Sequence, residues 1–192
     1  MDGPSNVAIG GAIEPGGSLG LFGWAAYFCR YSPYMLPLEA SANVELPGDN
    51  ASYDADILAR YVHLYEDGFW EPFVHRAMRA DGHRLAVVPD RIVWQVPGVQ
   101  VVGFCRQRFL HGKAHGVHRS EGASRARVLV QAAVAPMVPF LMAFRAGRHV
   151  FRKGRNRARF MAALPLVVWF YGWWAAGELA GCLQVARRAR VD

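Results

Sequence analysis

The sequence has 192 residues, of which 53% are hydrophobic and 19% are charged, and its formal net charge is +7. This length allows one domain of ordinary size or a small domain with an appendage, and the apolar content argues against a low-complexity disordered chain. The cysteines are three in number, far apart and in no Cys-x-x-Cys pair, which argues against a disulfide framework or a zinc site (Cys29, Cys105 and Cys182).

The charge is divided unevenly along the chain. Residues 1–90 carry 5 arginines, no lysine and 12 acidic residues, a net charge of −7, whereas residues 91–192 carry 17 basic and 3 acidic residues, a net charge of +14. The basic residues of the second half flank long apolar runs, which favours a surface of anionic lipid over nucleic acid. No nucleic-acid-binding motif occurs, so we expect membrane lipids as partners and no nucleic acid.

The first half predicts short elements separated by turns. Residues 1–23 are rich in glycine and proline and predict a loop, and residues 24–31 predict a short helix. Residues 47–50 predict a turn because of their Pro-Gly-Asp content, and residues 54–64 predict a helix by their apolar spacing. A second helix over 69–80, with Pro72 in its first turn, ends at Asp81-Gly82.

The elements after this helix are two strands and a basic helix. Residues 83–90 predict a strand and turn, and residues 91–96 predict another strand. Residues 104–118 then predict a polar, basic helix.

Two long apolar segments lie in the last third of the chain. Residues 128–144 are 17 uncharged residues interrupted by Pro136 and Pro139, and residues 160–177 are 18 uncharged residues. The second is close to the roughly 20 residues that a spanning helix needs. Seven basic residues lie between the segments, so an interfacial or re-entrant first segment would keep them on the cytoplasmic side. The second segment is then the sole span or also interfacial. Core helices of a soluble protein are the alternative.

The run Pro-Gly-Asp-Asn-Ala-Ser-Tyr at 47–53 is followed by a helix, by Trp70-Glu71, by Gly82 and by Val88-Pro89-Asp90. This order resembles the second half of the GT-A domain of glycosyltransferase family 2, over about residues 8–118. In that family a Gly-x-Asn turn leads into a helix, an acidic Glu-Asp site opens the next helix, and a strand with a Pro-Asp turn follows. Here Trp70 replaces the first acid of the pair and Glu71 matches the second.

The resemblance implies a fold and an activity. The fold class would be α/β, an incomplete Rossmann-like GT-A half domain over 1–118 followed by membrane-associated helices over 119–192. The activity would be transfer of a sugar from a nucleotide-sugar to a lipid-linked or glycan acceptor at the cytoplasmic face of the membrane. The complete enzyme would use a divalent metal, Mg²⁺ or Mn²⁺.

The resemblance also assigns roles to residues. Glu71 would be the general base that deprotonates the acceptor, with Glu66 and Asp67 as alternates, and a plain helix cap is the structural alternative for Glu71. Asp49, Asn50 and Trp70 would contact the acceptor, although Asp49 and Asn50 also suit a simple Asx turn.

Other polar patterns are less specific. Arg106 and Arg108 lie where many family members have Gln-x-x-Arg-Trp, and they would bind phosphates or form a solvated basic face. Cys105 stands where the glutamine should be, which argues against a processive polysaccharide synthase. Asp54-Ala55-Asp56 has the form of a metal motif but falls inside a helix after the turn. The face of His111, His115 and His118 has no acidic residue between them, so we predict no metal site in this chain.

Residues 1–47 contain no run rich in valine and isoleucine, and no acidic pair follows a strand there. A nucleotide-binding half would need such parallel strands. We therefore expect the chain alone to lack donor binding and transferase activity. The alternative function is a non-catalytic remnant or a membrane-bound interaction protein.

Overall fold

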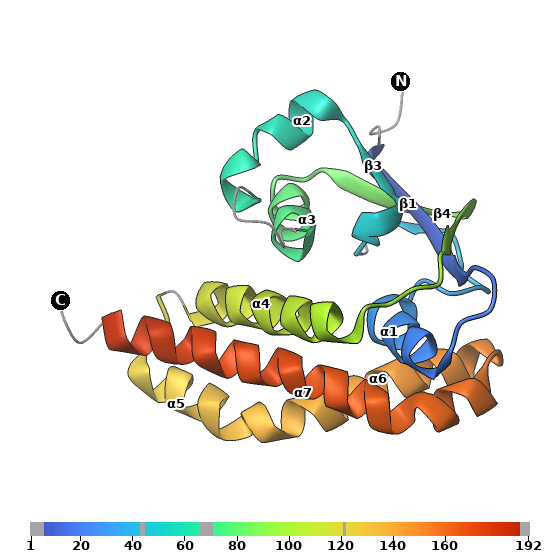
Figure 1. The fold of residues 1–192 in the computed structure, drawn as a ribbon. Coiled ribbons are helices and arrows are strands. Elements are labelled where there is room, and N and C mark those ends of the chain that lie inside the picture. The colour runs from blue at the N-terminus through green and yellow to red at the C-terminus, as the bar shows by residue number, and fades with distance from the viewer. Residues whose placement is uncertain (1–5, 43–44, 66–70, 121, 189–192) are drawn as a thin grey trace. The chain divides into compact units, whose positions relative to one another are not determined.

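The computed structural model describes residues 6–42, 45–65, 71–120 and 122–188 (Figure 1). Its fold is mixed α/β, with one four-stranded mixed sheet and several helices. The chain forms two compact units, the first from residues 1–16 and 33–96 and the second from residues 17–32 and 97–192. The segments 17–32 and 97–118 lie within the range 1–118 that was expected to form one half domain, but they belong to the second unit.

The first unit is built on the sheet. Its strands lie in the order β2-β4-β1-β3, and β1 runs parallel to β4 while the β1–β3 and β2–β4 pairs are antiparallel. The bounds are β1 (Asn6–Pro15), β2 (Ser41–Ala42), β3 (Ala51–Tyr53) and β4 (Arg84–Gln95).

The prediction of a loop over residues 1–23 and of no strand within residues 1–47 is wrong. β1 is an inner strand of the sheet, and Ala12 and Ile13 are almost completely buried. Its glycines are required by close backbone approach: a Cβ built on Gly11 would lie 2.0 Å from the carbonyl oxygen of Arg91. The glycines that suggested a loop therefore mark a crowded place in the sheet.

The two strands predicted over 83–96 are a single strand, β4. Val88-Pro89-Asp90 lies inside it rather than in a turn between strands. The pairing with β1 jumps from Gly10↔Val87 to Ala12↔Ile92, so the sheet has an irregularity opposite Gly11. A proline is tolerated there because a bulge relieves it of a ladder hydrogen bond.

Two helices pack on this unit. The predicted helix over 54–64 is shorter, since α2 (Ala55–Ala59) is followed by the 3-10 turn η2 (Val62–Leu64). The second predicted helix is confirmed as α3 (Glu71–Ala80), within the described residues. Val74, His75 and Met78 of this helix are buried, whereas Ala80 is exposed. The core that these side chains join consists of Ala8, Leu46, Tyr61, Val74, Met78, Leu85 and Val87.

The second unit is helical. The predicted basic helix over 104–118 is confirmed as part of α4, and it lies along α7 in parallel orientation, since Phe104 meets Phe170 and Ser120 meets Cys182 (Figure 1). The short helix α1 packs on α7 through Phe28 and Phe160. The helices are α1 (Leu21–Tyr31), α4 (Val101–Ser120), α5 (Arg125–Val134), α6 (Val138–Lys153) and α7 (Arg157–Arg188), with the 3-10 turn η3 (Ala135–Met137) between α5 and α6.

Two Gly-x-x-x-Gly pairs bring α4 and α7 into backbone contact. A Cβ on Gly112 would lie 2.1 Å from the carbonyl oxygen of Trp174, and one on Gly177 would lie 2.0 Å from that of Phe109. Gly116 and Gly181 make the corresponding contacts one turn later, at 2.2 Å each. Small residues at this spacing permit close helix packing in membrane proteins. The glycines that reduce helix propensity in α4 thus form its interface.

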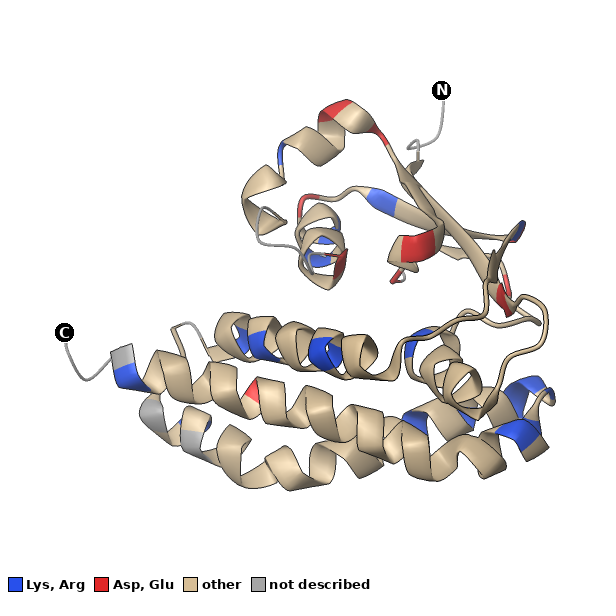
Figure 2. Cartoon of the chain, in the orientation of Figure 1, with Lys and Arg blue, Asp and Glu red and all other residues tan. Residues whose placement is uncertain are grey.

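Two stretches of the described residues are long and apolar enough to cross a membrane, Ala126–Lys153 and Arg157–Arg187. The first contains the predicted interruption, where Pro136 lies in η3 and Pro139 opens α6, but the helical path continues through it. Only 29% and 39% of the most apolar windows are buried. Most of their apolar surface therefore faces outward. Lysine and arginine residues gather where α6 joins α7 (Figure 2).

Candidate functional site

Glu71 lies where two of the sequence motifs meet. It is the first residue of α3, and its side chain packs directly on the turn η1 (Gly48–Asn50). A Cβ built on Gly48 would lie 2.2 Å from Glu71 Oε1, so a larger residue at position 48 would displace this carboxylate. Acidic side chains are common at this position, because the backbone N–H groups of the first helical turn have no partner within the helix.

A chain of hydrogen bonds lies in the same unit. Tyr53 Oη is 2.8 Å from His75 Nε2, and His75 Nδ1 is 2.9 Å from Glu45 Oε2. The other oxygen of Glu45 accepts a hydrogen bond from Arg79 Nη2. His75 is completely buried, and both of its ring nitrogens are therefore satisfied by side chains from β3 and from the segment before η1.

The electrostatics tie these groups to Glu71. Burial raises the pKa of Tyr34 and of Tyr53, and the negative charges of Glu45 and Glu71 raise both further. Burial alone would raise the pKa of Glu45, but the hydrogen bonds from His75 and Arg79 outweigh it, so that pKa is lowered. The two phenols thus stay neutral O–H donors within range of two carboxylates. We call Tyr34, Glu45, Tyr53, Glu71 and His75 the carboxylate site.

The residues expected to contact an acceptor divide into three cases. Asn50 donates hydrogen bonds to the carbonyl oxygens of Ala12 and Arg91, at 2.8 and 2.9 Å, and so fastens η1 to the sheet. Asp49 is exposed on the same turn. Trp70 lies outside the described residues, as do the alternate bases Glu66 and Asp67.

The Asp-x-Asp sequence at 54–56 has a structural role. The Asp54 carboxylate accepts a hydrogen bond from the backbone N–H of Ile57 at 3.0 Å and caps α2. Within the described ranges, no group of three or more His, Cys, Asp or Glu side chains is arranged to hold a metal ion. The metal expected for the complete enzyme thus has no fitting donor set among these residues.

In the second unit, the two arginines expected to bind phosphate differ sharply. Arg106 is exposed, whereas Arg108 is buried between the rings of Phe104 and Trp174, with its guanidinium carbon 5.1 and 5.4 Å from their centroids. Burial and the charge of Arg30 lower the pKa of Arg108. Its Nε is buried without a hydrogen-bond partner.

One residue of the histidine face of α4, His115, lies against α7. His115 Nε2 lies 4.0 Å from Glu178 Oε1, and Arg119 Nη1 donates to the same oxygen at 2.6 Å. Glu178 is 6% exposed and comes from a helix far along the chain. His115 and Arg119 therefore serve as basic partners of the buried Glu178 carboxylate.

Sequence reasoning did not identify four of the five members of the carboxylate site. Tyr34 and Glu45 lie in irregular segments, and no spacing links them to Glu71. His75 carried one signal, since it stands four residues after Glu71 on the same face of α3. Tyr53 was part of the quoted motif, but nothing indicated that its hydroxyl faces a buried imidazole.

No family model, curated protein or solved structure matches this chain. The candidate sites are therefore defined by their geometry and by the motifs that they contain.

Proposed function

We propose that the first unit is the acceptor side of an inverting glycosyltransferase of the family-2, GT-A type. It transfers a sugar from a nucleotide-sugar to a lipid-linked or glycan acceptor at the cytoplasmic face of a membrane. The observation that carries this proposal is the contact of Glu71 with Gly48, which joins the acidic helix start to the Pro-Gly-Asp-Asn turn. The two motifs are far apart in sequence, and their meeting is what a shared acceptor site requires.

Glu71 acts as the general base in this proposal. Its carboxylate takes the proton of an acceptor hydroxyl as that oxygen attacks the anomeric carbon, and the bond from the sugar to the nucleoside diphosphate breaks. The Tyr34 hydroxyl stays protonated and supplies a hydrogen bond to a sugar oxygen. The Tyr53 hydroxyl donates its proton to His75, so its oxygen is left to accept a hydrogen bond from a sugar hydroxyl. A divalent ion supports departure of the diphosphate in such enzymes. No step is assigned to an ion here, because the described residues lack a fitting donor set.

The second unit supports the membrane part of the proposal. Its two long apolar stretches leave most of their surface outward, and Arg108 offers a buried guanidinium donor for a phosphate oxygen. Guanidinium groups match phosphate geometry well. We assign Arg108, and not the exposed Arg106, to the phosphate of a donor or of a lipid-linked acceptor.

The test replaces the residue in the source cells, so that any further segment or partner of the protein is retained. Membranes from cells carrying Glu71→Gln should transfer labelled sugar from nucleotide-sugars about 10²–10⁴-fold more slowly than the parent. The matched control is Glu39→Gln, an exposed carboxylate of the same unit. Transfer that is equally fast in both variants would remove Glu71 as the base. Unchanged membrane glycans after deletion of the gene would favour a non-catalytic membrane-bound interaction protein.

A further inference from the structure

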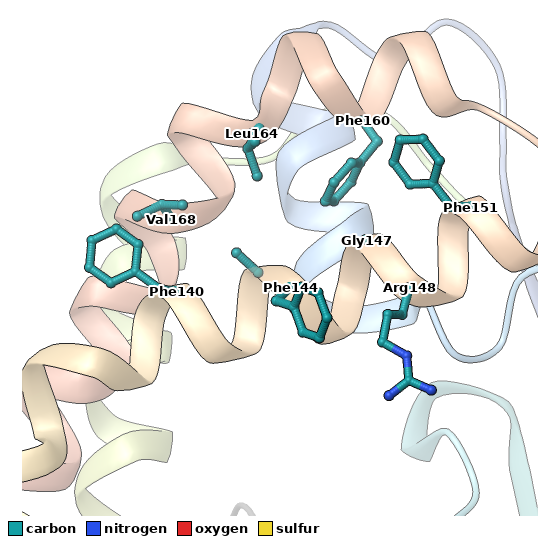
Figure 3. A pocket seen from close by; sticks show the side chains of 9 residues that line it. Phe140, Phe144, Gly147, Arg148, Phe151, Phe160, Leu164 and Val168 are labelled. Atoms are coloured by element: carbon teal, nitrogen blue, oxygen red, sulfur yellow. The ribbon is translucent and has the colours of Figure 1, made fainter.

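An apolar groove runs between α6 and α7. It has a volume of about 490 Å³, which is within the range of roughly 300–1,000 Å³ for small-molecule sites. Phe140 and Phe144 line it from α6, and Leu164 and Val168 line it from α7 (Figure 3). Arg148 is the single charged side chain in its lining, and its guanidinium points away from the apolar side chains.

The groove lies along one face of α6, and this face changes from apolar to basic along the helix. Phe140, Phe144, Arg148 and Phe151 follow one another at intervals of three or four residues, so they share a face. The three phenylalanines are well exposed, with exposed fractions of 59% for Phe140, 63% for Phe144 and 45% for Phe151. An apolar stripe on the surface of a soluble domain would be costly, whereas hydrocarbon chains cover it without cost.

The basic end of this face is strongly charged. Residues 145–159 contain seven basic residues and no acidic residue, and we call them the basic turn (Arg145, Arg148, Arg152, Lys153, Arg155, Arg157 and Arg159). Arg157 and Arg159 are engaged locally, with the Phe151 carbonyl and the Asn156 side chain. Arg145, Arg148 and Arg152 are exposed at helical spacing on α6. This face of α6 is therefore apolar near the start of the helix and carries several guanidinium groups near its end.

We propose that this groove binds an anionic glycerophospholipid, with one acyl chain against the phenylalanines and the phosphate on Arg148 and its basic neighbours. The occupant follows from the charge and from the shape together. Inorganic phosphate would use the arginines and leave the apolar wall uncovered. A second copy of this chain would bring another seven cations to the same place. A lipid with a net negative headgroup satisfies both ends. The proposal does not depend on the transferase activity.

The test uses the full purified chain in neutral detergent. A phosphatidylglycerol that carries a photoreactive group on its acyl chain is added at increasing concentration, and the cross-linked peptides are identified by mass spectrometry. Saturable cross-linking to α6 and α7 at the groove is expected. Phosphatidylcholine with the same reactive chain should label these helices at least about 10-fold less, and millimolar inorganic phosphate should not displace the labelled lipid.

Two kinds of variant separate the charge from the cavity. Arg148→Gln should weaken phosphatidylglycerol binding about 10-fold, whereas Arg187→Gln, at an exposed position far along α7, should change it less than 2-fold. Gly147→Leu should fill the groove, because a Cβ there would already lie 3.2 Å from the Phe160 ring. Gly172→Leu is its control, since a Cβ at Gly172 meets nothing within 4 Å. Val168→Phe narrows the groove from the opposite wall if Gly147→Leu does not fold.

Three results would overturn the proposal. Equal labelling by phosphatidylcholine would show that the headgroup charge is not recognised. Full displacement by inorganic phosphate would reduce the site to an anion site. Labelling spread evenly over α5, α6 and α7, and unchanged in folded groove variants, would show ordinary contact with surrounding lipid.

Discussion

Alanine substitutions at two glycines of the same helix should have opposite effects. Gly177 faces α4, where an added Cβ would lie 2.0 Å from the carbonyl oxygen of Phe109, whereas Gly172 has open space around its Cβ position. Ordinary contact at this surface begins at 3.4 Å, so Gly177→Ala must separate the backbones there by about 1.4 Å, the difference between 3.4 and 2.0 Å. Overpacking of this kind costs about 1–3 kcal/mol.

Helix propensity acts in the other direction. Alanine is favoured over glycine inside a helix by about 1 kcal/mol. The net expectation for Gly177→Ala is therefore a loss of up to about 2 kcal/mol, and for Gly172→Ala a gain of up to about 1 kcal/mol. Thermal unfolding of the detergent-solubilised variants, followed by circular dichroism, measures both.

A double-mutant cycle measures whether the effects of substitutions on α4 and on α7 depend on each other. Gly112→Ala on α4 should be costly alone but much less costly in the Gly177→Ala background, because the helices are already apart. If Gly177→Ala proves as stable as Gly172→Ala, α4 and α7 are not in backbone contact and the packing described above is wrong.

Three further predictions concern the rest of the chain. Because hydrogen bonds from His75 and Arg79 hold the pKa of Glu45 below its ordinary 4.5, the contribution of Glu45 to the stability of the first unit should be fully present above pH 4.5 and be lost as pH falls below it. Native-state hydrogen exchange of α3 should show this loss, and Glu45→Gln should reduce this pH dependence. His75→Phe should cost about 1–3 kcal/mol in chemical denaturation by stranding the partners of the imidazole, and a cost below about 0.5 kcal/mol would contradict the hydrogen-bond chain. The protein should sediment with membranes, resist carbonate and high-salt washing and require detergent, whereas recovery in the soluble fraction at low salt would refute the membrane assignment.

Sequence patterns predicted the helices better than the sheet. The helix ending at Ala80 and the basic helix of α4 follow from spacing and composition, and the apolar stretches follow from hydropathy alone. β1 was missed because Gly10 and Gly11 indicate a loop unless the neighbouring backbone is known. That the Arg91 carbonyl oxygen occupies the space beside Gly11 is a property of the folded sheet, which no local pattern encodes.

The candidate site shows the same division. Glu71 and the turn at Gly48 were both identified, because each belongs to a motif with a recognisable order. The imidazole of His75 was not, because its two hydrogen-bond partners come from a strand and from an irregular segment. The local sequence around a buried histidine on an apolar helix face is the same whether or not the folded chain brings a carboxylate and a phenol to its ring nitrogens.

The parallel pairing of α4 with α7 also sets an order of events during synthesis. The Sγ of Cys182 lies 3.8 Å from the carbonyl oxygen of Gly116, although the two residues are 66 positions apart in the chain. At roughly 5–20 residues per second, a ribosome needs about 3–13 s to add that many residues. Throughout this interval α4 has been synthesised, but α7, against which its glycines and Arg108 pack, has not. The α4–α7 interface can therefore form only after α7 has been synthesised.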